Sequence, residues 1–164
     1  MTPKIYIPID STALSLGAEE VYRTILLESK NRNLDIKIIR NGSRGLFFLE
    51  PLVEVETDKG RMAYGPVDPS DVASLFDSEF FIGKPHKLCL GLTDEIDWLK
   101  NQERLTYARV GITDPINIDD YEKYDGFKGL KNAIKLEPQL IVKEVTDSGL
   151  RGRGGAAFPT GIKW

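Results

Sequence analysis

Residues Lys4-Ile-Tyr-Ile-Pro-Ile-Asp10 begin a strand–helix–strand unit that predicts an α/β architecture for the first part of the chain. Its three isoleucines alternate with other residues, which predicts a β-strand. Pro8 has no N–H group to donate and is expected at a sheet edge or a bulge. Residues 18–31 then carry apolar side chains at helical spacing, after Ser15 or Gly17 as a cap. The β-branched residues of 35–40 predict the second strand.

Further elements are expected between residues 41 and 77. Asn41-Gly-Ser-Arg-Gly45 predicts a turn, and Asp58-Lys-Gly60 predicts a hairpin turn. We expect extended segments at 46–49, 52–57 and 61–64, and a second helix over 68–77 with Pro69 in its first turn. The order strand–helix–strand–strand–strand–helix predicts a small α/β sandwich that ends near residue 91.

The middle of the chain, residues 92–135, is polar and is predicted to be a connector of helical and extended pieces. Residues 104–115 have little helical period and end in a proline turn, so we expect an extended segment that lies on another surface. Residues 138–147 carry apolar side chains at roughly helical spacing and predict a helix.

Positive and negative charges are nearly balanced, because the chain has 22 Lys and Arg and 25 Asp and Glu, which gives a formal net charge of −3. No global basic excess favours nucleic acid or an anionic membrane as a partner. No apolar run approaches the ~18 residues that span a bilayer, and the N-terminus lacks the apolar core of a signal peptide. These features predict a cytoplasmic protein.

Cys89 is the one cysteine of the chain, and His86 is its one histidine. A single cysteine cannot form an intramolecular disulfide or a Cys-x-x-Cys redox pair. A two-iron cluster needs four thiolates, or two thiolates with two histidines, so these residues cannot supply its ligands, and we predict no metal ligands. We interpret Cys89, which lies in an apolar run, as a buried and inert thiol, and His86 as a loop residue without a catalytic role.

The last sixteen residues, Gly149-Leu-Arg-Gly-Arg-Gly-Gly-Ala-Ala-Phe-Pro-Thr-Gly-Ile-Lys-Trp164, combine five glycines, three cations and two aromatic rings with no acidic residue. Glycine lets the backbone approach a phosphate closely, successive free N–H groups form an anion-binding concavity, and Phe158 and Trp164 offer flat surfaces. This composition predicts a site for a phosphorylated aromatic cofactor. The alternative is a flexible Gly/Arg tail, against which the ordered Phe-Pro-Thr-Gly-Ile-Lys-Trp ending argues.

Two generic motifs fit the same region less well. Residues 152–157 match a dinucleotide fingerprint with alanine in the last position, but that fingerprint follows a strand, and residues 138–147 predict a helix. A phosphate-binding Walker loop needs Gly-Lys-Ser/Thr, and Gly161-Ile-Lys163 lacks that order. Elsewhere, the glycine-flanked Arg44 could contact an anion, but we favour a positively charged turn in water.

The terminal motif resembles the flavin loop of the NADH-oxidising flavoprotein subunits of respiratory complex I and their relatives, which usually read Gly-Leu-Arg-Gly-Arg-Gly-Gly-Ala-Gly-Phe-Pro-Thr-Gly-Leu-Lys-Trp. The chain departs from that form at Ala157 and Ile162. In a tight loop, alanine in place of glycine is tolerable only if φ is negative. Residues 41–56, 64–67 and 102–115 resemble the beta subunit of NAD-dependent molybdenum formate dehydrogenase in particular.

The resemblance implies a cysteine-poor thioredoxin-like domain over 1–91, a helical or extended connector over 92–135, and the truncated start of an FMN- and NADH-binding α/β domain over 136–164. The resemblance also implies cofactor-binding roles for seven residues of the loop and its neighbourhood: Gly152, Arg153, Gly154, Gly155, Ala157, Phe158 and Lys163. Phe158 matches the aromatic residue near the nicotinamide and Lys163 the lysine that contacts the flavin. No residue is assigned a catalytic acid or base role.

The function implied is that of a diaphorase-type subunit that passes electrons between NAD, FMN and iron–sulfur clusters. Its expected partners are a molybdenum-containing alpha subunit and an iron–sulfur gamma subunit, and a cluster is expected only in a part beyond residue 164. The piece alone is expected to be inactive, as a truncated or split subunit. The alternatives are a complex I or NAD-hydrogenase flavoprotein subunit, and a non-catalytic thioredoxin-like docking module.

Overall fold

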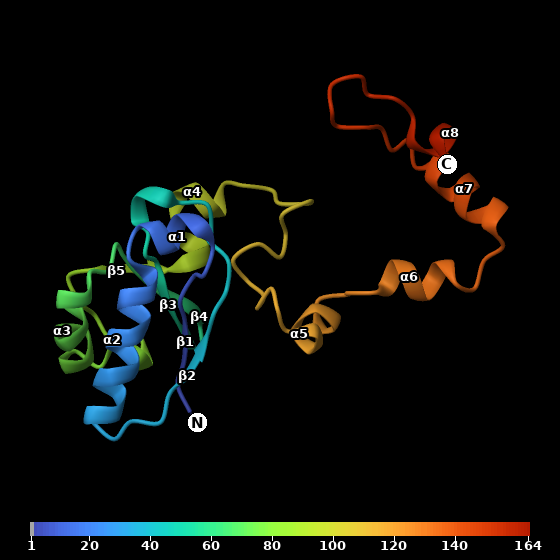
Figure 1. The fold of residues 1–164 in the computed structure, drawn as a ribbon. Helices are drawn as coiled ribbons and strands as arrows, with labels where there is room; N and C mark the ends of the chain where they lie inside the picture. The colour runs from blue at the N-terminus through green and yellow to red at the C-terminus, as the bar shows by residue number, and fades with distance from the viewer. Residues whose placement is uncertain (1) are drawn as a thin grey trace. The chain divides into compact units, whose positions relative to one another are not determined.

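The structure is a computed structural model that describes residues 2–164, and its contacts divide the chain into two compact units, Met1–Tyr121 and Glu122–Trp164 (Figure 1). The first unit contains a five-stranded sheet with the order β2-β1-β3-β4-β5. The strands are β1 Lys4–Tyr6, β2 Lys37–Ile39, β3 Val53–Thr57, β4 Gly60–Tyr64 and β5 Cys89–Leu92.

The sheet combines a parallel crossover with an antiparallel hairpin. β1 pairs with β2 in parallel through helix α2, Ala18–Asn31, and with β3 in antiparallel fashion. β3 and β4 form the predicted hairpin, with Thr57 opposite Gly60, and β5 adds a further antiparallel strand. A βαβ unit beside a hairpin, followed by helix α3, Val72–Asp77, is the order of a thioredoxin-like domain. The predicted α/β class is confirmed.

One face of this sheet forms the hydrophobic core. Side chains alternate between faces along a strand, and the fully buried Ile5, Ile7, Val53 and Val55 point to the same side. Helices α2 and α3 cover that side, as Figure 1 shows, and add further buried side chains to the cluster: Val21, Ile25, Val72, Leu75 and Phe76. Each fully buried aliphatic side chain contributes roughly 1.5–3 kcal/mol to this packing.

The boundaries of α2 follow from local chemistry. Gly17, in the left-handed region with φ +97°, precedes the helix as its N-cap, a conformation that glycine adopts without strain. Glu19 and Glu20 lie in the first turn and Lys30 in the last, which complements the helix dipole. The predicted span 18–31 is confirmed, and so is Gly17 as one of the two cap candidates.

The remaining elements of the first unit are short. They are α1 Ser11–Ser15, η1 Phe47–Leu49, η2 Pro69–Asp71, η3 Phe80–Ile82, η4 Thr93–Glu95, α4 Asp97–Lys100 and α5 Ile118–Lys123, which crosses the boundary between the units. The expected extended segment at 46–49 is wrong, because this stretch holds a 3₁₀ turn. Strand β1 already pairs with β2 and β3 on its two sides, and Phe48 packs edge-on against Trp98.

The second unit contains helices α6, Lys128–Ala133, α7, Pro138–Asp147, and α8, Thr160–Lys163. The predicted helix over 138–147 is confirmed. Pro138 opens it at the first position, where its missing N–H costs no hydrogen bond. Gly149 follows its end in the left-handed region with φ +67°, as is common after a helix. The predicted domain boundaries near residues 91 and 135 stay predictions.

Candidate functional site

The glycine-rich segment between α7 and α8 is a loop closed at its base. Arg151 and Pro159 form an isolated antiparallel bridge, in which the Gly152 N–H donates to the Phe158 carbonyl at 2.9 Å. The Thr160 N–H donates to the Leu150 carbonyl, also at 2.9 Å. The Arg151 guanidinium donates through Nε to the Ala157 carbonyl at 2.8 Å. This ordered closure argues against a flexible tail.

Between these closing bonds, the backbone presents free donors. Among residues 2–164, no carbonyl or side chain accepts a hydrogen bond from the backbone N–H groups of residues 153–157. A Cβ added at Gly154 or Gly155 would meet no atom within 4 Å, and Gly155 has φ +111°. Successive unpaired N–H groups in an open, glycine-rich loop are donors that suit a phosphate, so the residues fit the phosphorylated cofactor expected from the sequence.

Two cations belong to the same segment of the chain. Arg153 lies in the loop and Lys163 lies in α8, and both are exposed. Neither forms an ion pair within the described part of the chain. Phe158 is 53% exposed, so its ring is available to a planar ligand. The structure therefore brings six of the predicted residues onto one loop, Gly152, Arg153, Gly154, Gly155, Ala157 and Phe158, and Lys163 onto the helix that follows it.

Helix α8 is fixed in position by Gly161, which is buried. A Cβ at Gly161 would overlap the side-chain oxygen of Thr146 and would stand 2.7 Å from its Cα. This close backbone approach holds α8, with Lys163, against α7.

Ala157 adopts φ +49°, in the left-handed region. The negative φ that would make alanine tolerable at this position is therefore not observed. An alanine in this region is destabilised by roughly 1–2 kcal/mol relative to its right-handed conformation. The loop of this chain thus carries local strain that glycine would not.

A second polar site, in the first unit, was not predicted. On the sheet face opposite the core, the buried Glu54 accepts hydrogen bonds from Arg44 Nε at 2.8 Å and from Arg61 Nη1 at 3.0 Å. Arg44 is 7% exposed. The interpretation of Arg44 as a solvated turn residue is therefore wrong. Arg44 is buried because its partner Glu54 lies in β3 and because residues 104–112 cover the Arg44 side chain.

The same cluster holds residues 104–112 on the sheet. The Gly111 carbonyl accepts from Asn41 Nδ2 at 2.7 Å and from Arg61 Nη1 at 3.1 Å, and the Ile112 carbonyl accepts from Arg61 Nη2 at 2.7 Å. The expected extended conformation of residues 104–115 is wrong, because this segment consists mainly of turns. The surface on which it lies includes this second sheet face of its own unit.

Burial and charge shift several pKa values near this face. Burial raises the pKa of Tyr6 to about 12, and its hydrogen bond to Glu56 acts in the same direction. The Lys4 ammonium, 2.7 Å from Glu56, holds the pKa of that carboxyl below its usual range. Burial raises the pKa of Glu50, which accepts from Ser43 Oγ and the Leu52 N–H.

Cys89 is only partly buried, which corrects the fully buried thiol expected from its apolar run, since β5 lies at the edge of the sheet. His86 Nδ1 faces the Leu88 N–H at 3.2 Å and its Nε2 lies 3.1 Å from Ser74 Oγ. Within residues 2–164, no group of three or more His, Cys, Asp or Glu side chains is arranged to hold a metal ion. Over the same residues, no helix has the length and apolarity that crossing a membrane requires.

No protein-family model matches the chain, but parts of it are similar to subunits of known oxidoreductases. Over 65 residues it is 49% identical to the NADP-reducing hydrogenase subunit HndC of Solidesulfovibrio fructosivorans, covering 40% of this chain and 13% of that protein. It is 49% identical over 47 residues to an NADH-quinone oxidoreductase subunit of Streptomyces coelicolor, covering 29% and 10%. The NADH-quinone oxidoreductase subunit of the same kind from Escherichia coli is 47% identical over 51 residues, covering 30% and 12%.

The chain therefore spans only about a tenth of the length of these relatives. Among solved structures, the thioredoxin-like [2Fe-2S] ferredoxin from Aquifex aeolicus aligns with a TM-score of 0.47 and 19% identity, covering 55% of this chain and 97% of the ferredoxin. These matches relate parts of the chain to subunits of NADH- and NADP-linked oxidoreductases.

Proposed function

We propose that the chain is part of an NADH-binding flavoprotein subunit of an oxidoreductase, with the loop over residues 149–164 contributing to the FMN and NAD site. The observation that carries this proposal is the closed loop whose N–H groups at 153–157 are unpaired, with Arg153 in the loop and Lys163 in the helix that follows it. The names of the relatives, an NADH-quinone oxidoreductase subunit and an NADP-reducing hydrogenase subunit, support the same class of reaction.

Each residue of the loop has a distinct role in this proposal. Gly152, Gly154 and Gly155 let the backbone approach a phosphate, because no Cβ intrudes. Arg153 and Lys163 supply positive charge for phosphate oxygens. Phe158 offers its exposed ring to the flat part of the ligand. When bound, the flavin supplies the capacity to take up two electrons together and release them singly.

The finer proposal is the beta subunit of an NAD-dependent formate dehydrogenase, with a molybdenum-containing alpha subunit and an iron–sulfur gamma subunit as partners in the cytoplasm. It rests on the resemblance of residues 41–56, 64–67 and 102–115 to that branch. A complex I or NAD(P)-linked hydrogenase subunit is the second candidate, and it is favoured by the similarity to the NADH-quinone oxidoreductase and hydrogenase subunits.

Flavin binding tests the first proposal. FMN would be titrated into the polypeptide 1–164 and into the product of the full reading frame that contains it, with quenching of flavin fluorescence as the readout. We expect micromolar or tighter binding by the full product and little binding by residues 1–164, because the loop needs a supporting scaffold to be preorganised. A full product that is colourless and does not oxidise NADH would contradict the proposal.

Variants of the full product connect the binding to the loop. Lys163→Gln and Arg153→Gln are each expected to weaken FMN or NADH binding by roughly tenfold, the loss of one charge-assisted contact. Lys143→Gln is the matched control, because Lys143 is an exposed lysine of α7 that pairs with Asp147. Equal binding by all three variants would exclude a role for the two cations.

The branch is tested with the assembled complex. NAD reduction would be followed with formate and, separately, with hydrogen as the electron donor. Activity with formate alone supports the formate dehydrogenase proposal, and activity with hydrogen alone supports the hydrogenase candidate.

A further inference from the structure

A buried cluster of charged side chains lies on the second sheet face. Glu54 is 1% exposed and is the carboxylate shared by two guanidinium groups, since it accepts from Arg44 through Nε and Nη2 and from Arg61 through Nη1. Glu56, opposite Arg61 in the β3–β4 pair, also compensates the Arg61 charge, which adds to that of Lys4 in lowering the pKa of the Glu56 carboxyl. The group of this cluster that keeps an unused donor is Arg44, whose Nε and Nη2 contact Glu54 and whose Nη1 does not.

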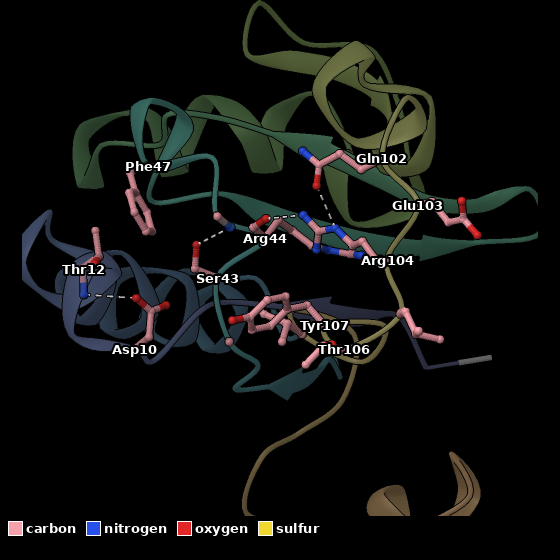
Figure 2. Close-up of a pocket in the computed structure, with 14 residues that line it drawn as sticks. Asp10, Thr12, Ser43, Arg44, Phe47, Gln102, Glu103, Arg104, Thr106 and Tyr107 are labelled. Carbon is pink, nitrogen blue, oxygen red and sulfur yellow. Dashed lines mark hydrogen bonds between the residues drawn. The ribbon is translucent and has the colours of Figure 1, made fainter. Parts of the chain in front are cut away.

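Arg104 adds a second guanidinium group next to Arg44. It donates through Nη2 to the Arg44 carbonyl at 2.8 Å and through Nε to Gln102 Oε1 at 3.1 Å. Both acceptors are neutral, and Arg104 forms no ion pair with a carboxylate in the described part of the chain. Figure 2 shows Arg44 and Arg104 next to each other, with Gln102 at the same site.

The carboxylates that face Arg44 Nη1 and Arg104 interact with them only weakly. Asp94 Oδ1 lies 3.9 Å from Arg44 Nη1 and its side chain is 85% exposed, so solvent screens the interaction. Asp97 is occupied by Lys100, at 2.9 Å. No hydrogen bond from Nη1 of Arg44 or Nη1 of Arg104 to any of residues 2–164 is formed.

The two arginines meet at a small pocket. It has a volume of about 260 Å³ and is lined by Arg44, Lys100 and Arg104, three cations, against Asp94 as its carboxylate; Leu99, Gln102, Ala108 and Ile112 complete the wall. This space admits a small oxyanion. Arg44 and Arg104 also line the larger pocket of Figure 2, of about 860 Å³, whose wall includes the rings of Phe47 and Tyr107 and the carboxylates of Asp10 and Glu103.

We propose that this pocket binds a phosphate-type oxyanion between Arg44 and Arg104, with Lys100, which also pairs with Asp97, in its wall. Guanidinium groups are the preferred partners of phosphate because their donors match its oxygens. The larger pocket is open to the remainder of a phosphorylated ligand, since both pockets share Arg44, Gln102 and Arg104. This site is separate from the glycine-rich loop and does not depend on the function proposed for it.

The test uses inorganic phosphate as the probe, added to the chain while thermal unfolding and amide NMR shifts are followed, with NaCl at the same ionic strength as a reference. We expect saturable binding, with shifts centred on Arg44 and Arg104, and a rise in melting temperature that NaCl does not reproduce. A non-saturable response equal to that of NaCl would overturn the proposal.

Arg104→Gln is the principal variant, because Arg104 is only partly buried and is not the partner of Glu54. It should lower phosphate affinity by roughly tenfold, and Lys100→Gln should lower it by a smaller factor. Arg23→Gln is the matched control, since Arg23 is an exposed helix arginine paired with Glu19, and it should leave the affinity unchanged. Folded Arg104→Gln and Lys100→Gln proteins that bind phosphate as tightly as the control would refute the site.

A comparison of inorganic phosphate with AMP identifies the source of the oxyanion. AMP bound at least tenfold more tightly supports a nucleotide whose ring reaches Phe47 and Tyr107. Equal affinities support free phosphate.

Discussion

Gly111 lies directly against the side chain of Arg44, and a Cβ at Gly111 would overlap Arg44 Cδ and stand 3.1 Å from Nε. Gly111 also has φ +77°. These two constraints make glycine necessary at the point where residues 104–112 cross the buried charges. Gly111→Ala should therefore destabilise the first unit by about 2 kcal/mol or more, as measured by urea unfolding.

Gly45→Ala separates the cost of the positive φ from the cost of the steric overlap with Arg44. Gly45 has a similar φ of +86°, but a Cβ there meets nothing within 4 Å. It should show only the backbone cost of roughly 1 kcal/mol. Equal losses for the two variants would mean that contact with Arg44 does not restrict residue 111.

Removal of the Glu54 charge should be strongly destabilising. Glu54→Gln leaves the Arg44 and Arg61 guanidinium groups without their shared carboxylate, and breaking a buried pair costs about 3–5 kcal/mol. Urea unfolding of this variant should be compared with that of Glu28→Gln, which removes a surface pair with Arg32 and should cost about 0.5 kcal/mol or less. If the two variants lose similar stability, the buried cluster does not stabilise the fold.

Glu50 should make stability depend on pH. Burial raises its folded pKa above the ordinary value of 4.5, so the folded protein holds this proton more tightly than the unfolded chain does. The contribution is fully present below pH 4.5 and is lost as the pH rises through the folded pKa. Between pH 4 and 7, Glu50→Gln should therefore gain stability relative to the native protein as the pH rises. A constant difference across this range would contradict the assignment.

Ala157→Gly should relax the glycine-rich loop. Because φ is +49° at this position, glycine removes about 1 kcal/mol of strain. This energy corresponds to roughly fivefold slower hydrogen exchange of the amides that close the loop. The amides to follow are those of Gly152 and Thr160. Ala156→Gly, at a residue without positive φ, should instead speed exchange. Faster exchange in both variants would show that residue 157 is not strained.

Local sequence patterns predicted those elements whose causes are local. Helix α2 could be placed from its apolar spacing and the glycine before it, and helix α7 from Pro138 and its apolar residues. The hairpin between β3 and β4 followed from Asp58-Lys-Gly60. In these segments the burial pattern and the cap lie within a few residues of each other.

Long-range contacts explain what the sequence did not predict. Arg44 is buried because Glu54 lies in β3 and because Gly111, far later in the chain, packs on its side chain. No periodicity within the turn 41–45 indicates these partners. The positive φ of Ala157 was equally hidden, because alanine gives no signal for that conformation. In the loop, by contrast, glycine-rich composition predicted an anion-binding backbone, and the structure has unpaired N–H groups there. The binding roles of the individual residues stay predictions.

The contact between Gly161 and Thr146 has an evolutionary consequence. Since α8 sits on the backbone of α7 with no room for a methyl group, the two positions cannot vary independently. Natural variants with a larger residue 161 must shift α8 along α7. Residues 146 and 161 should therefore covary among homologous sequences, while neighbouring exposed positions such as Ile162 vary independently.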